Sequence, residues 1–160
     1  MSVKLLRIVK LVTDFDEFLL NKNNIGWLGG CSVPDVQRLL ESPLATTENN
    51  FKVFISSIHT SLGESMDRNG KLHGNKNYFW TYFKDTFPDL QKILHKIRIY
   101  RHSTEHISLD EKPKENYFKF LDEDLNGSIP FFKEHGYHIL QTKIILDLET
   151  SLEKSLSNID

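Results

Sequence analysis

Apolar residues recur at helical spacing along most of the chain. Between residues 4 and 21 they form one broad stripe, at Leu5, Ile8, Val9, Val12, Phe15 and Leu19. This spacing is typical of an amphipathic helix, because it places the apolar side chains on one face. Similar patterns predict long helices over residues 47–64, 88–109 and 137–156, and a further helix that Asp110 caps and that ends at Asn126 and Gly127.

Polar and glycine-rich stretches separate these segments. "NNIGWLGG" ends the first helix, and "SVPDVQRLLES" predicts a short helix with Ser32 as its cap and Pro34 in its first turn. "MDRNGKLHGNKN" predicts a loop, "NYFWTYFKDTF" resumes the helical pattern, and Pro88 restarts or kinks it. No strand pattern of useful length occurs. The sequence predicts one all-α domain over residues 1–160, an antiparallel helix bundle of about five helices.

Composition and charge narrow the function classes. The 160 residues are 39% apolar and 26% charged, which is typical of one globular domain with a sizeable core. A net charge of −2 provides no global basic field, so a contact with nucleic acid would need a local patch. The single cysteine, Cys31, excludes an internal disulfide and a cysteine-based zinc site, and we expect it to be a small apolar filler in a reducing compartment.

No targeting or membrane segment is expected. The first twelve residues are mostly apolar, as in a signal peptide, but the charged residues Lys4, Arg7 and Lys10 recur among them. No apolar run approaches about 18 residues. We therefore expect a cytoplasmic protein with no membrane partner. The aromatic residues between 78 and 87 could stack on nucleobases, but their helical spacing favours a place in the core.

The candidate chemistry lies in "YRHSTEHISL", residues 100–109. It brings Arg101, His102, Glu105 and His106 close together in the sequence. From His102 the stretch matches H-x-x-E-H, an inverted zinc-protease signature with two ligands and a general base. From Arg101 it matches R-x4-H, a permanent cation five residues before an imidazole.

A helical projection divides this segment into two faces. One face is the expected core stripe, made of Ile93, Ile97, Tyr100, Thr104 and Ile107. The opposite face carries His95, His102 and His106, flanked by Arg98 and Glu105, with Arg101 at the border. Lys92, Lys96, Arg98 and Arg101 form a basic strip suited to phosphates. The alternative interpretation of this face is a solvated helix surface.

The zinc interpretation lacks a third ligand. His102 and His106 could share one metal, but His95 lies about 10 Å from His102 along the helix axis and cannot complete a tetrahedral site. A ligand from elsewhere, such as Glu111, Glu123 or His138, has no spacing that selects it. We therefore expect no metal.

The phosphodiesterase interpretation uses the same residues more fully. RNA cleavage without a metal needs a base for the ribose 2′-hydroxyl, an acid for the leaving oxygen, and positive charge near the phosphorane. An imidazole can act as base or acid near neutral pH, and an arginine offers permanent charge with a planar donor fork. A two-fold dimer would supply a second Arg–His pair.

"IRIYRHSTEHISL" resembles the motif of the HEPN domains, helical bundles with R-x4-6-H and often a polar residue after the arginine. Arg101 and His106 occupy the defining positions and His102 the polar one, where many members have asparagine. "NYFKFLDEDLNG" and "GYHILQTKIILDL" resemble segments that follow the motif in one bacterial group. The resemblance covers about the last 80 residues. It implies a homodimeric, cofactor-free, metal-independent endoribonuclease, often a toxin or antiviral-defence effector with a protein antitoxin, whose motif lines the dimer cleft.

The resulting hypothesis assigns a role to each residue. His106 would be general base or acid, Arg101 the phosphate contact, His102 and Glu105 supporting residues, and Arg98 and Lys96 substrate-binding residues. A second R-x4-H copy, Arg68 to His73, ranks lower because the loop predicted there would not fix the two side chains together. The alternative function is a non-catalytic helical module of the same fold that binds a partner protein.

Overall fold

The computed structural model describes residues 1–105 and 110–158, with the backbone alone described for Glu105. The helices in chain order are α1 (Ser2–Asn23), α2 (Val36–Leu40), α3 (Glu48–Ile58), the π-helical turn η1 (His59–Gly63), α4 (Glu64–Leu72), the π-helical turn η2 (Phe79–Phe83), α5 (Lys84–Thr86), α6 (Pro88–Glu105), α7 (Glu111–Leu125), the 3-10 turn η3 (Pro130–Phe132) and α8 (Gly136–Ser157). Within these residues there is no strand, so the predicted all-α bundle is confirmed.

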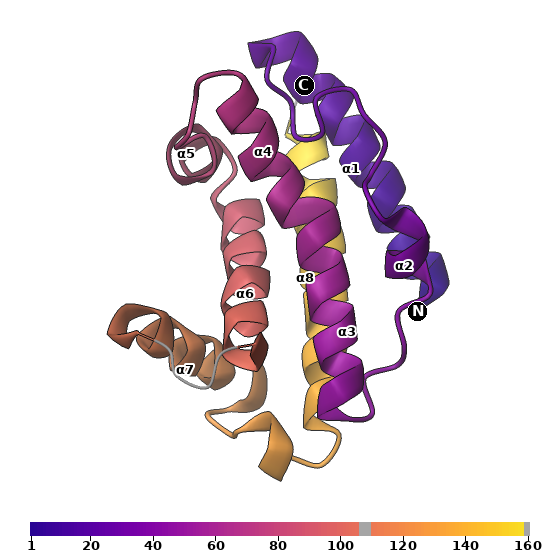
Figure 1. Ribbon diagram of the computed structural model, residues 1–160, viewed down its shortest axis with the longest axis vertical. Coiled ribbons are helices and arrows are strands. Elements are labelled where there is room, and N and C mark those ends of the chain that lie inside the picture. The colour runs from indigo at the N-terminus through magenta and orange to yellow at the C-terminus, as the bar shows by residue number, and fades with distance from the viewer. Residues whose placement is uncertain (106–109, 159–160) are drawn as a thin grey trace.

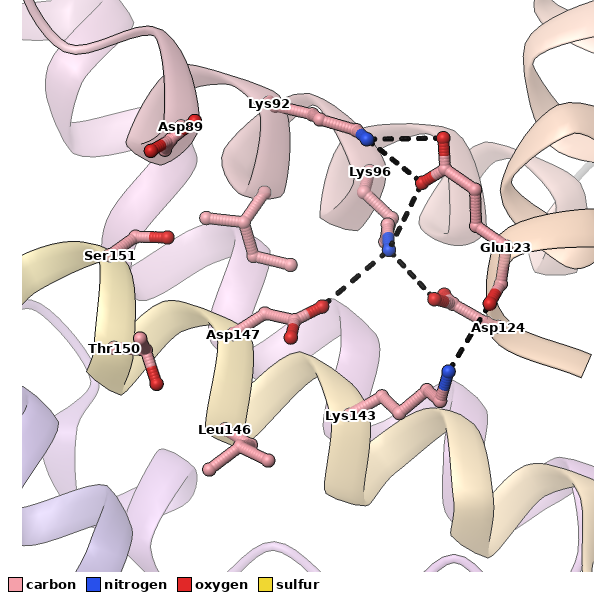
Figure 2. Close-up of a pocket in the computed structure, with 11 residues that line it drawn as sticks. Asp89, Lys92, Lys96, Glu123, Asp124, Lys143, Leu146, Asp147, Thr150 and Ser151 are labelled. Atoms are coloured by element: carbon pink, nitrogen blue, oxygen red, sulfur yellow. Dashed lines mark hydrogen bonds and ion pairs between the residues drawn. The ribbon is translucent and has the colours of Figure 1, made fainter.

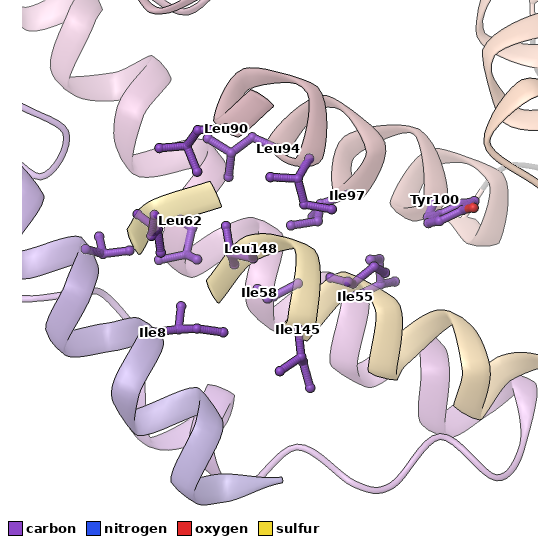
Figure 3. Packing of buried hydrophobic residues seen from close by; sticks show 14 of the residues in the cluster. Ile8, Ile55, Ile58, Leu62, Leu90, Leu94, Ile97, Tyr100, Ile145 and Leu148 are labelled. Carbon is purple, nitrogen blue, oxygen red and sulfur yellow. The ribbon is translucent and has the colours of Figure 1, made fainter. Parts of the chain in front are cut away.

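Helix α8 is the centre of the bundle (Figure 1). It packs against α1, α3, α6, α7 and η3, so most of its circumference is covered by other helices. Its sequence suits this position because apolar residues occupy more than one face, and the buried ones are Leu140, Ile144, Ile145, Leu148 and Leu152. Side chains from α1, α3, α6 and α8 meet in one continuous core (Figure 3).

The directions of the helices follow from the connections. α6 runs antiparallel to α8, and Asp89 at its start pairs with Lys154 near the end of α8. α1 runs in the same direction as α8 in Figure 1. This is allowed because the chain after α1 returns along that helix, so that the Ser2 hydroxyl donates to the Leu40 carbonyl at 3.3 Å.

The helix predicted over residues 47–64 begins where the sequence indicates and continues further. The Thr47 side chain accepts from the Asn50 N–H at 3.2 Å and caps α3. The chain then passes through η1 directly into α4 and stays helical to Leu72. The loop predicted at residues 66–77 is therefore wrong in its first half.

Packing explains why this glycine-containing segment is helical. A Cβ at Gly70 would lie 2.9 Å from the Asn75 carbonyl oxygen and 3.0 Å from the Tyr78 Cβ. The glycine thus allows a close approach of the returning chain, whose burial outweighs the roughly 1 kcal/mol cost of glycine in a helix. Met66 and Asn69 are buried on the same helix.

The other predicted boundaries are mostly correct. Asn126 takes a left-handed conformation and ends α7, followed by Gly127 with φ +77°. Phe87 is non-helical and Pro88 restarts the helix as α6. Ser32, however, caps nothing: Asp35 adopts a left-handed conformation, so α2 begins only at Val36.

A buried carboxylate organises the loop after α1. Oδ1 of Asp16 accepts backbone N–H bonds from Trp27 at 2.6 Å, Leu28 at 2.6 Å and Gly29 at 3.1 Å, and Oδ2 accepts from Gly30 at 2.8 Å. Four successive N–H groups can converge on one side chain only if the backbone curls around it. The sequence "IGWLGG" permits this curl because its glycines have φ of +70 to +75°.

The curled loop inserts Trp27 into the core. Its indole Nε1 donates to the Leu62 carbonyl in η1 at 2.8 Å. Its ring makes edge contacts with Phe15 at 6.2 Å and Phe83 at 5.6 Å between centroids. Phe83 and Phe87, predicted to be core aromatics, are buried here, whereas Trp80 from the same segment is exposed at 42%.

Among the helices that the structure describes, none combines the length and the apolar character needed to cross a bilayer.

Asp16→Ala is expected to lower the free energy of unfolding by about 3–5 kcal/mol, because four backbone donors would lose a charged acceptor in a buried site. Asp14→Ala is the matched control on the exposed face of α1 and should change stability by less than about 0.5 kcal/mol. Urea unfolding of both variants measures the difference. A loss below about 1 kcal/mol in Asp16→Ala would show that the loop is held by other contacts.

Candidate functional site

Helix α6 carries the predicted site and lies between two layers of the protein. It packs against α3 and η1 on one side and against α7 and α8 on the other. Ile93, Ile97 and Tyr100 are buried, as the helical projection predicts, and Thr104 is half-buried. Ile107 lies outside the described residues.

The face predicted to point away from the core is partly covered. His95 is half-buried, with its ring 5.1 Å from Trp80 and 5.9 Å from Phe120 between centroids. Burial, with smaller contributions from Arg98 and Lys84, lowers the pKa of His95. The expectation of a fully outward histidine is therefore wrong for His95, because η2 and α7 add a second layer over α6.

Of the central motif, the structure places Arg101 and His102 on the last turn of α6, both half-buried. His106 lies outside the described residues, as does the side chain of Glu105. The relation of His106 to Arg101 thus stays a prediction.

The predicted basic strip divides between the two layers, and Lys96 belongs to the α7–α8 side (Figure 2). Its ammonium group lies 2.8 Å from Asp124 Oδ1, 3.6 Å from Asp147 Oδ2 and 3.8 Å from Glu123 Oε2, and its side chain is only 5% exposed. The three carboxylates use its charge to hold α7 and α8 against α6. The structure does not bring Lys96 together with Arg101, which contacts His59 on η1 and Glu64 on α4.

Two more side chains join this ion cluster. Lys92 pairs with Glu123 at 3.0 Å, and the Tyr100 hydroxyl donates to Asp124 Oδ2 at 2.7 Å. Burial and the Asp124 carboxylate raise the pKa of Tyr100, so its hydroxyl stays a donor. A cavity of about 500 Å³ lies over this cluster, between α6, α7 and α8. Its cations and carboxylates are already matched, so the cavity has no excess positive charge for a phosphate.

Arg98 and Arg101 face α4 and η1. Arg98 pairs with Asp67 and stacks its guanidinium over the rings of Phe79 and Trp80, at 5.7 Å from each centroid. Arg101 Nη1 lies 3.3 Å from Glu64 Oε1. Each cation that the sequence places in the strip therefore has a carboxylate partner.

A histidine that sequence reasoning missed completes the site. His59 in η1 is 4% exposed, and its Nδ1 lies 3.3 Å from Arg101 Nη1 and 3.4 Å from Glu64 Oε1. Burial, followed by the charge of Arg101, lowers the pKa of His59 to about 4, although Glu64 opposes the shift. The imidazole is thus neutral at pH 7, and because a guanidinium can only donate, Nδ1 accepts from Arg101.

The π-helical turn makes room for this histidine. A Cβ at Gly63 would lie 3.2 Å from His59 Cδ2, so glycine lets the imidazole pack against the following turn. The sequence signal for His59 was its place among Ile55, Ile58 and Leu62 on the buried face of its helix. A histidine on an apolar face that meets α6 requires a polar partner there, and Arg101 supplies it.

The second R-x4-H copy lies at the end of a helix rather than in a loop. Arg68 lies on α4 and His73 follows its last residue, with both side chains exposed. The reason for ranking this copy lower, a loop conformation, is therefore wrong. Cys31, expected to be an apolar filler, is also exposed.

Comparisons with protein-family models, with curated proteins and with solved structures give no match for this chain. Within residues 1–105 and 110–158, no group of three or more His, Cys, Asp or Glu side chains is arranged to hold a metal ion. The H-x-x-E-H signature lies partly outside those ranges.

The His59 pKa predicts a specific pH dependence of stability. Between pH 6.5, the ordinary value, and about 4, the unfolded chain binds a proton at this position that the folded chain does not. The free energy of unfolding should therefore fall as the pH is lowered through this window. His59→Gln, which keeps an acceptor for Arg101, should lose about 2 kcal/mol less than the parent over the same range.

Urea unfolding at several pH values measures this difference. His73→Gln, a change at an exposed histidine, is the control and should retain the parent slope. Identical slopes in the parent and His59→Gln would contradict the neutral, buried state of His59.

Proposed function

We propose that the chain is a metal-independent endoribonuclease of the HEPN type, acting in the cytoplasm, whose site is centred on Arg101. The observation that carries the proposal is the convergence on Arg101 of an imidazole and a carboxylate, with Nη1 at 3.3 Å from both His59 Nδ1 and Glu64 Oε1. Two neutral or negative acceptors fix the guanidinium at the surface end of α6. A fixed arginine stabilises a phosphorane better than a mobile one, because it needs no reorganisation during the reaction.

The roles of the residues follow from their exposure. Arg101 is half-buried, and its planar guanidinium suits two phosphoryl oxygens of a substrate. His59 is too buried to take a proton from the substrate, so it is a positioning residue for Arg101. His106 remains the proposed general base or acid, with His102 and Glu105 in supporting roles. Substrate must compete with Glu64 for Arg101, and the half-exposed Glu64 can rotate toward solvent.

A two-fold dimer is part of this proposal. Arg101 is 27% exposed on the last turn of α6, so an isolated site there would be in contact with water. Water weakens electrostatic contacts with the phosphorane, whereas a second copy would exclude water and supply a second Arg–His pair. An antitoxin or another protein could cover the same surface.

The second candidate is a helical module that binds a partner protein without catalysis. It is favoured by the pairing of Lys92, Lys96, Arg98 and Arg101 with carboxylates, which leaves little free positive charge along α6 for RNA. The exposed rings of Phe131 and Phe132 on η3, at 70% and 80%, also suit a protein contact.

RNA cleavage in excess EDTA tests the first candidate. The purified protein should cleave single-stranded RNA and leave 2′,3′-cyclic phosphate and 5′-hydroxyl ends. Arg101→Ala and His106→Ala should each reduce the rate about 10²- to 10⁴-fold, the range for loss of an acid–base or charge-stabilising group. His73→Ala should change little, and Arg7→Ala, at an exposed ion pair between α1 and α8, is the matched arginine control.

Three outcomes would redirect the assignment. Loss of activity in EDTA that zinc restores would support the H-x-x-E-H interpretation. Activity lost in His73→Ala but kept in His106→Ala would move the site to the second motif copy. Absence of cleavage over many RNAs would support the protein-binding module.

The dimer has its own test. Light scattering of the active protein should give about twice the chain mass of 18.7 kDa. A mixing experiment can then test whether the motifs of both protomers contribute to one site. Mixing inactive Arg101→Ala with inactive His106→Ala should restore part of the activity if the sites are shared. A stable, active monomer would rule out the shared cleft.

A further inference from the structure

Arg68 forms no ion pair with any residue that the structure describes. In this it differs from Arg98 and Arg101 of the proposed ribonuclease site. The carboxylates nearest to it on its own helix are already engaged: Glu64 pairs with Arg101 and Asp67 pairs with Arg98. Glu64 lies four residues before Arg68 on the same helix and could pair with it, but Glu64 pairs with Arg101 on α6 instead. Arg68 is exposed on α4 and makes no ion pair in the described chain, although Glu64 and Asp67 line a neighbouring hollow with it.

This charge lies at a cavity. A hollow of about 260 Å³ opens between α4 and the loop of residues 28–34, and Arg68, His73, Cys31 and Ser32 are among its lining residues. None of the residues that line it is an aspartate or glutamate. Arg68 brings guanidinium donors, and His73 brings an imidazole that can donate a hydrogen bond in either protonation state. The lining thus combines donors and positive charge with no opposing carboxylate.

The cavity wall opposite α4 is a loop whose backbone is held in place by hydrogen bonds. The Asp16 carboxylate fixes the N–H groups of residues 27–30, as described above. Asn69 ties the loop to α4 through its bond to the Ile25 carbonyl. Gly29 lets the two walls meet, since a Cβ there would lie 2.5 Å from Asn69 Oδ1. A preformed cavity saves the cost of ordering when a ligand binds.

The other part of the lining is apolar. Leu28, Pro34 and Leu72 contribute to the same hollow. Its volume is close to the lower end of small-molecule sites, about 300 Å³, so it fits a compact ligand with one charged and one less polar part. A lone inorganic ion would leave most of this volume to water.

We propose that the cavity between α4 and the 28–34 loop binds a small phosphomonoester, with Arg68 and His73 on the phosphate and the apolar wall against the rest of the molecule. An arginine is suited to this ligand because its planar fork matches two phosphoryl oxygens. A nucleoside monophosphate and a sugar phosphate share this chemistry. The site is separate from Arg101 and does not depend on the proposed ribonuclease activity.

Calorimetric titration of the full chain with adenosine monophosphate, ribose 5-phosphate and inorganic phosphate tests the proposal and distinguishes the ligand sources. At least one phosphomonoester should bind saturably, adenosine without phosphate should not, and added salt should weaken binding. Arg68→Ala should weaken it at least about tenfold, the effect of losing a charged hydrogen-bond pair. Arg38→Ala is the matched control, because Arg38 is also exposed and without an ion pair in the described chain but does not line this cavity.

Cys31 provides a second, independent readout. It is the chain's single cysteine, it is exposed, and it lines the cavity, so iodoacetamide reports on this place alone. Saturating ligand should slow its alkylation several-fold in the parent and in Arg38→Ala, but not in Arg68→Ala at the same concentration. Absence of saturable binding up to about 10 mM, binding unchanged in Arg68→Ala, or binding that leaves Cys31 equally reactive would each overturn the proposal.

Discussion

The bond set around Asp16 is the interaction on which the rest of the structure depends. The carboxylate fixes the 27–30 backbone, that backbone places the Trp27 indole against the Leu62 carbonyl, and Leu62 belongs to the π-helical turn that presents His59. His59 in turn holds Arg101 on α6. A single buried charge on the first helix is thus connected, through three successive contacts, to the candidate site near the end of α6. Such a chain of contacts is effective because each polar atom that makes one of these contacts is paired in a buried environment.

A second constraint is charge neutrality along α6. This helix lies between two layers, so its lysines and arginines cannot all reach water, and each is matched by a carboxylate from α4, α7 or α8. The pairs fix the neighbouring helices and reduce the electrostatic attraction for a polyanion. Arg101 pairs with Glu64, whose side chain is 48% exposed, so a phosphate that reached Arg101 would displace a partly solvated carboxylate.

The spacing of apolar residues predicted the helices and the buried face of α6, because the face that packs against the core must be apolar. It placed Ile93, Ile97 and Tyr100 correctly. It failed for His95 and Lys96, because the pattern of one helix carries no information about a second layer that covers its other side. It also failed at residues 66–72, where Gly70 marks a close packing contact rather than a loop. His59 was missed because a histidine among apolar residues reveals its partner only when the facing helix is known.

The π-helical turn at residues 59–63 adds one residue to the segment without changing the orientation of the helices on either side of it. A π-helical turn is wider than an α-helical one and rotates the chain less per residue, so its five residues give about the same net rotation as four residues of α-helix. Deleting one residue there would therefore keep Glu64 and Asp67 on the side of α4 that faces α6. It would remove the widened turn in which the His59 imidazole packs against Gly63. The extra residue thus provides space for a buried side chain, whereas the relative orientation of α3 and α4 does not depend on it.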